Sequence, residues 1–464
     1  MLVLRSNHTP LRAIELLGGS IGSLVDVRNR RLINLELMII KYKRNTILGS
    51  LLITSFTGTG YASDQDIVDA GDALQYLLPA SAYLGTIIAR DKEGAIMYTK
   101  SLVTQGVIIA AGKEIASKFR PNGDSTKSWP SGHTGAAFSG ASFLYTRYGK
   151  VYGIPAYALA AFTGYSRVNA DAHHVDDVLS GMSVGLFSNW FWVSPHESRV
   201  VAYPSVYNDK YYLNLKISED PGKKKKVDRS KRGKYRYSLY FGPADQRSNI
   251  VKSPNNSNGT EFNLITFSER NDPTTTANVR FDARLSDRSY LGFSIEPFEA
   301  RDTGQFSQPV NFAGTSFPAN NDTYSRYRLT DIRLQYNYNL LPQNNKWDFK
   351  VGGAISAQRT VVELQTTEDP PAFYGKVDDW ALLPLLNLEA TYNIGSNMAL
   401  IADGNWISTS NDEHLDASLM FNYMFDRHWD AGIGYAEYKR RTDTDELLNS
   451  VKYNVVVLNV GYTF

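Results

Sequence analysis

Three short stretches of the chain carry side chains that together could handle a phosphate group. They are Lys113–Pro121 (KEIASKFRP), Pro130–His133 (PSGH) and Ser166–Asp177 (SRVNADAHHVDD). In order, they supply two cations, a backbone anion site with a histidine, and a third cation followed by a histidine and an aspartate. This set predicts phosphoryl transfer in which side chains do the chemistry, with no metal ion and no cofactor.

The first stretch supplies the two cations. Lys113 and Arg120 are seven residues apart, which is two turns of a helix, so we expect them to share one helix face. Pro121 follows and should end that helix. Two fixed cations near a helix end can bind phosphate oxygens, and an arginine can do so through two parallel hydrogen bonds. Alone, either cation would be an ordinary solvated residue.

The second stretch opens another expected helix. Ser131 and Gly132 would leave backbone N–H groups without partners inside the helix, and the helix dipole adds to their attraction for an anion. The glycine allows a phosphate to approach the backbone closely. His133 follows and can protonate a leaving oxygen.

The third stretch supplies Arg167 and a histidine–aspartate pair. His173 and Asp177 are four residues apart, so we expect them to stack on one face of a helix that begins there. An imidazole held by a carboxylate through one nitrogen presents the other nitrogen as a nucleophile. His174 and Asp176 would point elsewhere, and we interpret them as structural.

The order and spacing of the three stretches, K-x6-R-P, then P-S-G-H, then S-R-x5-H-x3-D, resemble the signature of the type 2 phosphatidic acid phosphatase superfamily. That superfamily also contains bacterial acid phosphatases and vanadium haloperoxidases. The resemblance implies a helical bundle and metal-independent hydrolysis of phosphate esters through a phosphohistidine. It implies that His173 is the nucleophile, Asp177 orients it and His133 protonates the leaving group. The groups that it implies for binding the phosphoryl oxygens are Lys113, Arg120, Arg167, Ser131 and the backbone of Gly132.

The composition excludes some functions. The chain has 464 residues, a net charge of +2 and no cysteine. The near-neutral charge gives no reason to expect a nucleic-acid partner. The lack of cysteine excludes thiol chemistry and thiolate metal sites, and it fits a chain that passes through an oxidising envelope without disulfides.

Residues 1–62 have the features of a targeting segment. Basic residues at 41–44 precede a short apolar run at 47–56, and Gly60 and Ala62 are small residues of the kind that a signal peptidase reads. Met38 is a candidate start, which would make 1–37 an extension. The alternative is a short N-terminal membrane helix.

Residues 63–200 are expected to form the helical phosphatase domain. Apolar residues recur at helical spacing in 66–78, 95–119, 132–148 and 176–192. None of these segments has the uninterrupted apolar length of a membrane span. We therefore expect the phosphatase domain to lie in the periplasm.

Residues 201–464 are expected to form an antiparallel transmembrane β-barrel. Apolar and polar residues alternate along successive segments, as in 332–340, and the last segment ends on Phe464. A barrel needs this pattern, because one face of each strand meets lipid and the other faces the lumen. A soluble β-sandwich is the alternative. The twelve candidate strands are 210–218, 234–242, 260–268, 276–286, 289–298, 326–340, 347–361, 381–393, 397–407, 414–425, 429–441 and 451–464.

The connections predict which end of the barrel faces outward. Those near 299–325, 362–380 and 442–450 are long, and those near 287–288, 394–396 and 426–428 are short. Outer-membrane barrels have long external loops and short periplasmic turns, so both ends of the barrel chain should be periplasmic. The connection near 243–259 is long where a short turn is expected. The basic run at 222–234 is interpreted as a solvated external loop or linker, with contact to anionic lipid head groups as the alternative.

The barrel segment offers no site of comparable quality. Its histidines are His414, at an expected external strand start, and His428, at an expected periplasmic turn, and both are interpreted as interfacial polar residues.

The combined hypothesis is a lipid phosphate phosphatase anchored in the outer membrane, with outer-membrane lipids as partners. Anchoring favours a lipid phosphate because enzyme and substrate then share one plane. Three alternatives stay open: a vanadate-dependent haloperoxidase in the same pocket, a transport barrel with an accessory phosphatase-like domain, and an adhesin or structural anchor.

Overall fold

The computed structural model describes residues 63–196, 233–267, 274–341, 346–368 and 370–464, together with the backbone of a few short strands outside these ranges. The predicted targeting segment, 1–62, and all but the last two residues of the basic run at 222–234 lie outside the described residues. The helices of residues 68–195 and the barrel of residues 227–464 belong to one compact unit.

The helical part is a bundle of five α-helices. Their bounds are α2 (Asp64–Ile88), α3 (Lys92–Ala116), α4 (Gly132–Phe143), α5 (Lys150–Asn169) and α6 (Val175–Trp192), and a π-helical turn, η2 (Leu144–Tyr148), extends α4. The four predicted helical segments match α2, α3, α4 with η2, and α6. Helix α2 continues through Pro79, ten residues beyond its predicted end. In the part of the chain that the structure describes, no helix combines the length and the apolarity that crossing a membrane requires.

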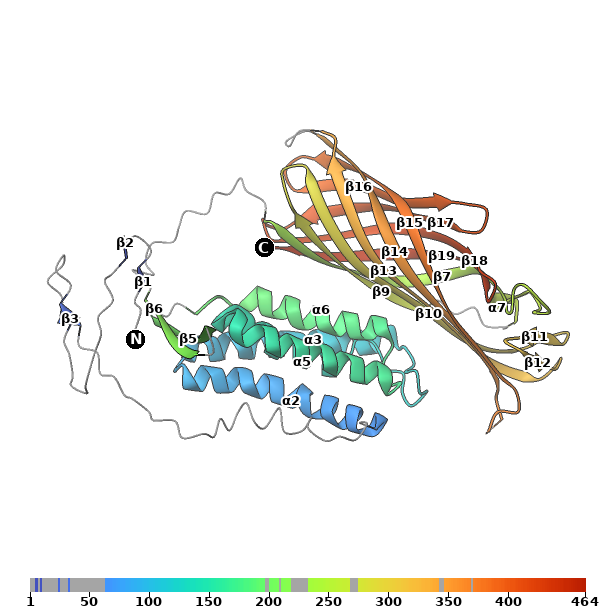
Figure 1. The fold of residues 1–464 in the computed structure, drawn as a ribbon, viewed down its shortest axis with the longest axis horizontal. Coiled ribbons are helices and arrows are strands. Elements are labelled where there is room, and N and C mark those ends of the chain that lie inside the picture. The colour runs from blue at the N-terminus through green and yellow to red at the C-terminus, as the bar shows by residue number, and fades with distance from the viewer. Residues whose placement is uncertain are drawn as a thin grey trace. The chain divides into compact units, whose positions relative to one another are not determined.

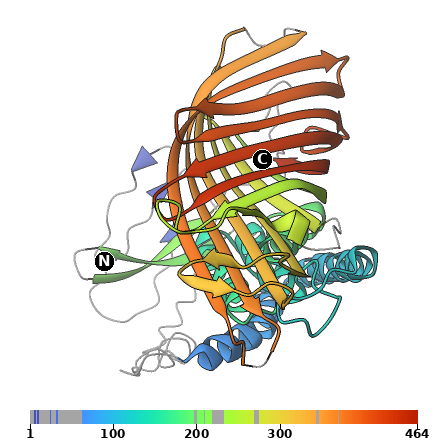
Figure 2. The same cartoon turned by 90° about the vertical axis from the view of Figure 1, so that its right-hand side faces the viewer.

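The C-terminal part is a closed antiparallel barrel of ten strands (Figures 1 and 2). Closure comes from the pairing of the first barrel strand with the last, in which Tyr237 lies opposite Tyr462. The strands are β7 (Tyr235–Lys252), β9 (Thr274–Arg284), β10 (Ser289–Gln305), β13 (Asp322–Asn339), β14 (Trp347–Thr366), β15 (Tyr374–Ile394), β16 (Met398–Ser408), β17 (Glu413–Met424), β18 (Trp429–Asp443) and β19 (Leu448–Thr463).

The predicted alternation of apolar and polar faces is present. Along β13, Asp331, Arg333 and Gln335 are buried, whereas Ile332 and Leu334 are exposed on the outer face. Buried polar residues on one face and exposed apolar residues on the other are the pattern of a strand between lipid and a polar lumen. The prediction of a helical region followed by an antiparallel barrel is thus confirmed.

The predicted count of twelve strands is wrong by two. The segment 210–218 forms β6 (Lys210–Ile217), which pairs only with β5 (Val200–Tyr207) in a separate two-stranded sheet. The segment 260–268 forms the two-residue strand β8 (Phe262–Asn263), which pairs with β7 outside the closed ring, and the short helix α7 (Leu264–Phe267). Leu264 and Phe267 are both buried. Residues three apart share a helix face, whereas a strand would direct them to opposite faces.

The two ends of the barrel differ in two connections, 253–273 and 306–321, which are longer than the rest. The long loops predicted near 362–380 and 442–450 are wrong, because the strands extend into them and leave connections no longer than those of the opposite end. One end, called the turn end here, carries Tyr235, Phe464 and the connections 285–288, 340–346, 395–397 and 425–428. The other, the loop end, carries 253–273, 306–321, 367–373, 409–412 and 444–447, with β11 (Val310–Phe312) and β12 (Thr315–Phe317) inside the second of these (Figure 1). Strand β7 runs on to Lys252, so the unexpectedly long connection near 243–259 is strand followed by a loop-end connection.

Helix α6 packs lengthwise on the outer face of the barrel. Its C-terminal Trp190 stacks on Tyr462, with ring centroids 5.0 Å apart, at the turn end. Near its middle, the hydroxyl groups of Ser183 and Tyr237 are 2.7 Å apart and hydrogen-bonded. One hydrophobic cluster contains bundle residues such as Ala137 and Leu179 together with Tyr237, Leu239, Ala277 and Val279 of the barrel. The bundle therefore covers a sector of the barrel surface that would otherwise face lipid.

Candidate active site

The two cations of the first stretch lie on different elements. Lys113 is in the last turn of α3, but the helix stops at Ala116 because Ser117 adopts a left-handed backbone with φ of 44°. Arg120 therefore belongs to the following loop, where its backbone N–H bonds to Ser125 O at 2.8 Å. The expectation of a shared helix face is wrong.

The second stretch forms the start of α4, as predicted. Ser131 is the N-cap, and its hydroxyl accepts a long hydrogen bond of 3.4 Å from the backbone N–H of Thr134. Its own N–H donates to Asp177 O at 2.9 Å, which fixes α4 against α6. A Cβ added to Gly132 would meet only one atom, Ile109 Cγ2, at 3.9 Å. The backbone at Gly132 thus has open space in front of it, as phosphate binding at a helix N-terminus requires.

His133 and Arg167 meet at a carboxylate that the sequence patterns did not single out. Asp72 Oδ1 lies 2.6 Å from Arg167 Nη1 and 3.3 Å from His133 Nε2. Arg167 also donates to the backbone oxygen of Val68 at 2.9 Å. Asp72 lies on α2, 95 residues before Arg167, so no local motif marks it. The Asp72 carboxylate thus bridges the arginine and the histidine.

His173 is almost completely buried, with 2% of its surface exposed, beside a fully buried Asp177. The nearest approach is 3.8 Å, from His173 Nδ1 to Asp177 Oδ2, which is longer than a hydrogen bond. The two residues do not stack within one helix, because α6 begins at Val175 with His174 as its N-cap. The predicted pair of His173 and Asp177 is therefore an electrostatic contact. His173 Nδ1 has no hydrogen-bond partner among the described residues.

Asp177 is held by a dense set of donors. Its Oδ2 accepts from Ser128 Oγ and, at 2.9 Å, from the backbone N–H of His174, and its Oδ1 lies 3.0 Å from Lys118 Nζ. Lys118 also binds Asp176, at 2.7 Å. The sequence patterns missed Lys118, which lies two residues before Arg120, because a second lysine in a basic stretch carries no distinguishing signal. It neutralises a buried acidic pair and fixes the carboxylate that faces His173.

The charged groups of the site shift the pKa values of its histidines. Burial lowers the pKa of His133 to about 4, with Arg167, His173 and Arg120 adding to the shift and Asp72 opposing it. Burial also lowers the pKa of His173, and Lys113 and Arg120 add to that shift while Asp177 opposes it. These interactions indicate that the predicted cations and both histidines converge on one region.

Asp177 stays ionised in this region. Burial alone would raise its pKa, but Lys118, His173, His174 and Ser128 outweigh burial and hold it below its usual range. The site therefore combines a buried carboxylate, two histidines that are neutral at pH 7 when the site is empty, and several cations around an open helix N-terminus.

The barrel contributes contacts to the same site. His174 Nδ1 lies 3.0 Å from Glu299 Oε2 on β10, and Arg326 on β13 lies 3.1 Å from Asp171. Arg301 donates to the backbone oxygen of Pro121. Glu299 is itself held by Arg326 at 2.8 Å and by Arg301 at 2.7 Å. The loops before α4 and α6 are thus tied to the barrel wall.

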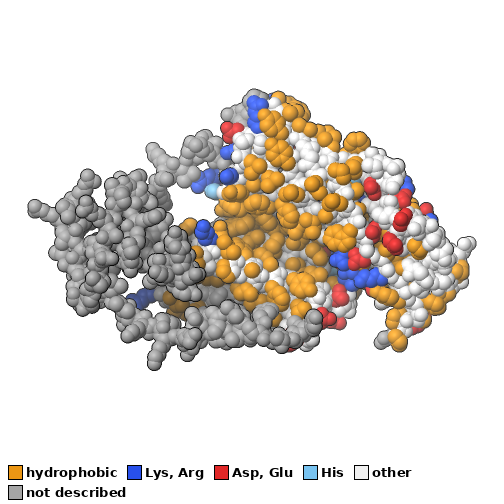
Figure 3. All heavy atoms as spheres, viewed as in Figure 1, with side chains coloured by type: hydrophobic (Ala, Val, Ile, Leu, Met, Phe, Trp, Pro, Cys, Tyr) orange, Lys and Arg blue, Asp and Glu red, His pale blue; other side chains and the backbone are white. Residues whose placement is uncertain are grey.

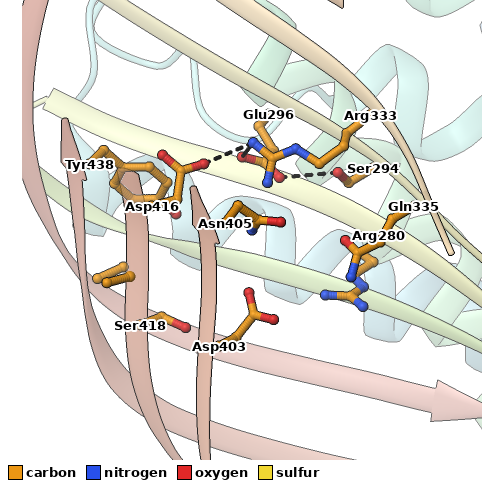
Figure 4. A pocket seen from close by; sticks show the side chains of 12 residues that line it. Arg280, Ser294, Glu296, Arg333, Gln335, Asp403, Asn405, Asp416, Ser418 and Tyr438 are labelled. Atoms are coloured by element: carbon orange, nitrogen blue, oxygen red, sulfur yellow. Dashed lines mark hydrogen bonds and ion pairs between the residues drawn. The ribbon is translucent and has the colours of Figure 1, made fainter. Parts of the chain in front are cut away.

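The barrel lumen holds a separate polar network (Figure 4). Arg333 lies 2.5 Å from Asp331 and 2.8 Å from Asp416, and Arg440 lies 2.9 Å from Asp416. His414 is fully buried among these groups, 2.8 Å from Asp416, so its interpretation as an interfacial residue is wrong. His428 is in a turn-end connection, as predicted, with Nδ1 2.7 Å from Thr463 O.

The lumen also contains a group with metal-ligand chemistry. Ligand atoms of Asp331, His414 and Asp416 all lie within 4.8 Å of one another. Guanidinium groups already contact both carboxylates, which accounts for their charge without an ion. We interpret this group as part of the network that fills the lumen.

Comparison with known proteins identifies the family. A model of the PAP2 superfamily matches residues 94–199, which include all the signature residues. The chain is 33% identical over 155 residues to a lipid A 4'-phosphatase of Helicobacter pylori, covering 77% of that protein and 30% of this chain. The chain belongs to the PAP2 superfamily. The resemblance drawn from the three stretches is thereby confirmed.

A second PAP2 relative matches over a shorter length. The chain is 34% identical over 114 residues to a lipid A 1-phosphatase of Porphyromonas gingivalis, and the match spans a quarter of the length of each protein. Among solved structures, the crystal structure of Aquifex aeolicus LpxE matches a third of the chain with 19% identity and a TM-score of 0.26. The outer membrane protease OmpT of Escherichia coli matches half of the chain with 8% identity and a TM-score of 0.33.

Proposed function

We propose that this protein is a phosphatase of lipid phosphates that works through a phosphohistidine at His173. The observation that carries the proposal is the buried pair of His173 and Asp177 next to the N-terminus of α4, where Ser131 N–H bonds to Asp177 O. The charges of Lys113 and Arg120 act on His173, and that of Arg167 acts on His133. The superfamily match and the two lipid A phosphatase relatives support it.

In the first step, His173 attacks the phosphorus. Nδ1 faces Asp177, so Nε2 is the nitrogen that is available for attack. The bond from phosphorus to the lipid oxygen breaks, and His133 gives its proton to that oxygen. Asp177 stabilises the positive charge that develops on the His173 ring, and it closes the 3.8 Å gap as that charge grows.

In the second step, water replaces the enzyme nitrogen. His133, now neutral, takes a proton from the attacking water, and the bond from phosphorus to His173 breaks to release inorganic phosphate. The cations and the N–H groups at Gly132 hold the three phosphoryl oxygens through both steps, because negative charge is spread over those oxygens in the transition state. No step requires a metal ion.

The substrate class follows from the anchor and the relatives. Both curated relatives are named as lipid A phosphatases, and the barrel has the apolar outer face of an outer-membrane protein. A phosphorylated lipid of the outer membrane is therefore the substrate that this geometry supports best. The location of the site in the periplasm, expected from the sequence, stays a prediction.

The decisive test is phosphate release by the purified protein from phosphatidic acid, from lipid A and from a water-soluble aryl phosphate, all with EDTA. We expect release from at least one lipid phosphate that EDTA does not diminish and that vanadate inhibits. Oxidation of halide on addition of vanadate and peroxide, without phosphate release, would instead identify the haloperoxidase. Ion conductance without either activity would favour the transport barrel.

The pH dependence gives a prediction that involves Asp72. The pKa values of both histidines are shifted below 6.5, so we expect kcat/KM to be greatest on the acidic side of pH 6.5 and to fall at higher pH as His133 loses its proton. Asp72 raises the pKa of His133, so Asp72→Asn should move the profile to lower pH and lower kcat/KM at pH 7 by about tenfold.

The matched control for Asp72→Asn is Asp69→Asn, one turn earlier on the same helix. Comparing the variants on one substrate cancels the titration of the substrate itself. An Asp72→Asn profile that coincides with that of the unchanged protein would show that this carboxylate does not set the protonation of His133.

A further inference from the structure

The phosphate site lies toward the loop end of the barrel. Among the described residues, the polar contacts between the site and the barrel involve residues toward the loop end of their strands: Glu299 and Arg301 on β10, and Arg326 on β13. Thr274, the first residue of β9 at the loop end, donates to the backbone oxygen of Glu299. The opposite end of α6 meets Trp429 and Tyr462 at the turn end. Helix α6 thus runs from the loop end, at the site, toward the turn end.

The outer face of the barrel changes character at the height of the site. Along β13, Tyr338, Tyr336, Leu334 and Ile332 are exposed apolar residues, and the next outward residues beyond Thr330 are Arg328 and Arg326. Along β10, Leu291, Phe293 and Ile295 are followed on the same face by Pro297, Glu299 and Arg301. Figure 3 shows hydrophobic side chains across the outer face, and a cluster of charged side chains toward the loop end.

The length of the strands agrees with this boundary. Strands β13, β14 and β15 have 18, 20 and 21 residues. A tilted strand needs about 9–11 residues to cross the hydrocarbon core. The apolar part of β13, from Thr330 to the turn end at Asn339, accounts for one such crossing. The charged part with Arg326 therefore lies beyond the hydrocarbon on the loop side.

The bundle also has an uncharged part that is bounded by charged residues at both ends. Helix α6 has no charged residue between Asp177 and its end at Trp192, and α5 has none between Lys150 and Arg167. The 18 residues of α6 are about 27 Å long at 1.5 Å per residue, close to the height of a barrel's apolar band. Helix α6 is not apolar enough to cross a membrane alone, but its polar residues Ser183, Ser188 and Asn189 are buried and would not meet lipid beside the barrel. At the end away from the site, Arg147 pairs with Asp91 and donates to Ser194 O just beyond α6.

Exposed apolar residues of the bundle continue the surface of the barrel. They lie on uncharged parts of the helices and include Leu84 and Ile87 on α2, Val103 and Val107 on α3, and Ile154 on α5. Acyl chains are the occupant that fits, because this surface adjoins the lipid-facing surface of the barrel and both end at charged layers of the same height.

We infer that the phosphate site opens at the outer-leaflet side of the outer membrane, at the height of the lipid head groups. The orientation follows from the two longest connections, 253–273 and 306–321, since long connections are external in barrels of this class and both are at the end that carries the site. This reverses the periplasmic location expected from the sequence. On the proposed function, the substrate class is then a phosphorylated lipid of the outer leaflet, whose phosphate reaches the site while its chains stay beside the bundle.

The chain offers a direct test because it contains no cysteine. Four exposed positions each receive one cysteine: Thr126→Cys beside the site, Lys150→Cys at the other end of the bundle, Ser307→Cys in a loop-end connection and Ser396→Cys in a turn-end connection. Intact cells with truncated surface polysaccharide are treated with a maleimide that carries a polyethylene glycol chain too large for porins. Labelling is read as a gel shift before and after permeabilisation of the outer membrane.

We expect Thr126→Cys and Ser307→Cys to react in intact cells, and Lys150→Cys and Ser396→Cys to react only after permeabilisation. Reaction of Thr126→Cys only after permeabilisation, together with Ser396→Cys, would place the site in the periplasm and overturn the inference. Reaction of Ser396→Cys but not Ser307→Cys in intact cells would show the barrel inverted and would also overturn it. Labelling does not depend on catalysis, so failure of the proposed activity would be seen separately, in the phosphate-release assay.

Discussion

Replacing His173 with alanine should reduce phosphate release by at least about a thousandfold, because the variant lacks the atom that forms the covalent intermediate. The ring is buried and faces the carboxylate of Asp177, so no neighbouring side chain can take its place. Binding of the lipid should change little, since the cations that hold the phosphoryl group are on other elements. The measurement is kcat for a lipid phosphate, with KM determined in parallel.

The matched control is His428→Ala, which removes a histidine from a turn-end connection far from the site along the chain. It should keep the full activity of the unchanged protein. Rapid acid quenching with a radiolabelled phosphate ester should trap acid-labile label on the unchanged protein and none on His173→Ala. A His173→Ala variant that turns over at more than a tenth of the original rate would exclude the phosphohistidine route.

The family and most of the site could be predicted from the sequence because the chemistry is carried by short, spaced motifs. Ser131 and Gly132 begin a helix as expected, since serine caps helix ends and glycine allows close approach. The geometry within two motifs could not be predicted. A left-handed residue at Ser117 ends α3 early, and His174 rather than His173 caps α6. One residue in an unusual conformation overrides helical spacing, and the spacing itself does not reveal it.

The residues that the sequence analysis missed share a physical cause. Asp72 contacts Arg167 across 95 positions, and Glu299 lies against His174 across the boundary between the bundle and the barrel. Such contacts depend on how whole elements pack, which no local pattern encodes. The same applies to His414, whose place in a strand was predicted correctly but whose side chain faces the lumen and not the interface.

Contacts between the bundle and the barrel hold the loops of the site in place. Glu299, Arg301 and Arg326 tie the loops that carry His174, Pro121 and Asp171 to a strand wall. Strands closed into a barrel cannot shift register one at a time, so they provide a rigid support for these loops of the bundle. An anchor that only held the protein in the membrane would not need these contacts.

Asp177→Asn is the second substitution with a large expected effect. The amide has the shape of the carboxylate but no charge, so it cannot stabilise the positive His173 ring that forms on attack. In the serine protease triad, the corresponding change costs about ten-thousandfold in kcat. The 3.8 Å separation here indicates a weaker initial contact, and we expect a loss of about a hundredfold to a thousandfold.

The neighbouring carboxylate provides the comparison that separates charge stabilisation from folding. Asp176 binds the same Lys118, at 2.7 Å, but does not face His173. Asp176→Asn should therefore weaken the packing around Lys118 to a similar extent while losing less than about tenfold in kcat. Asp177→Asn should also move the pH profile of kcat/KM to lower pH, because the carboxylate opposes the lowering of the pKa of His173. Equal losses of kcat in the two variants, with no displacement of the profile, would mean that Asp177 acts only as a structural partner of Lys118.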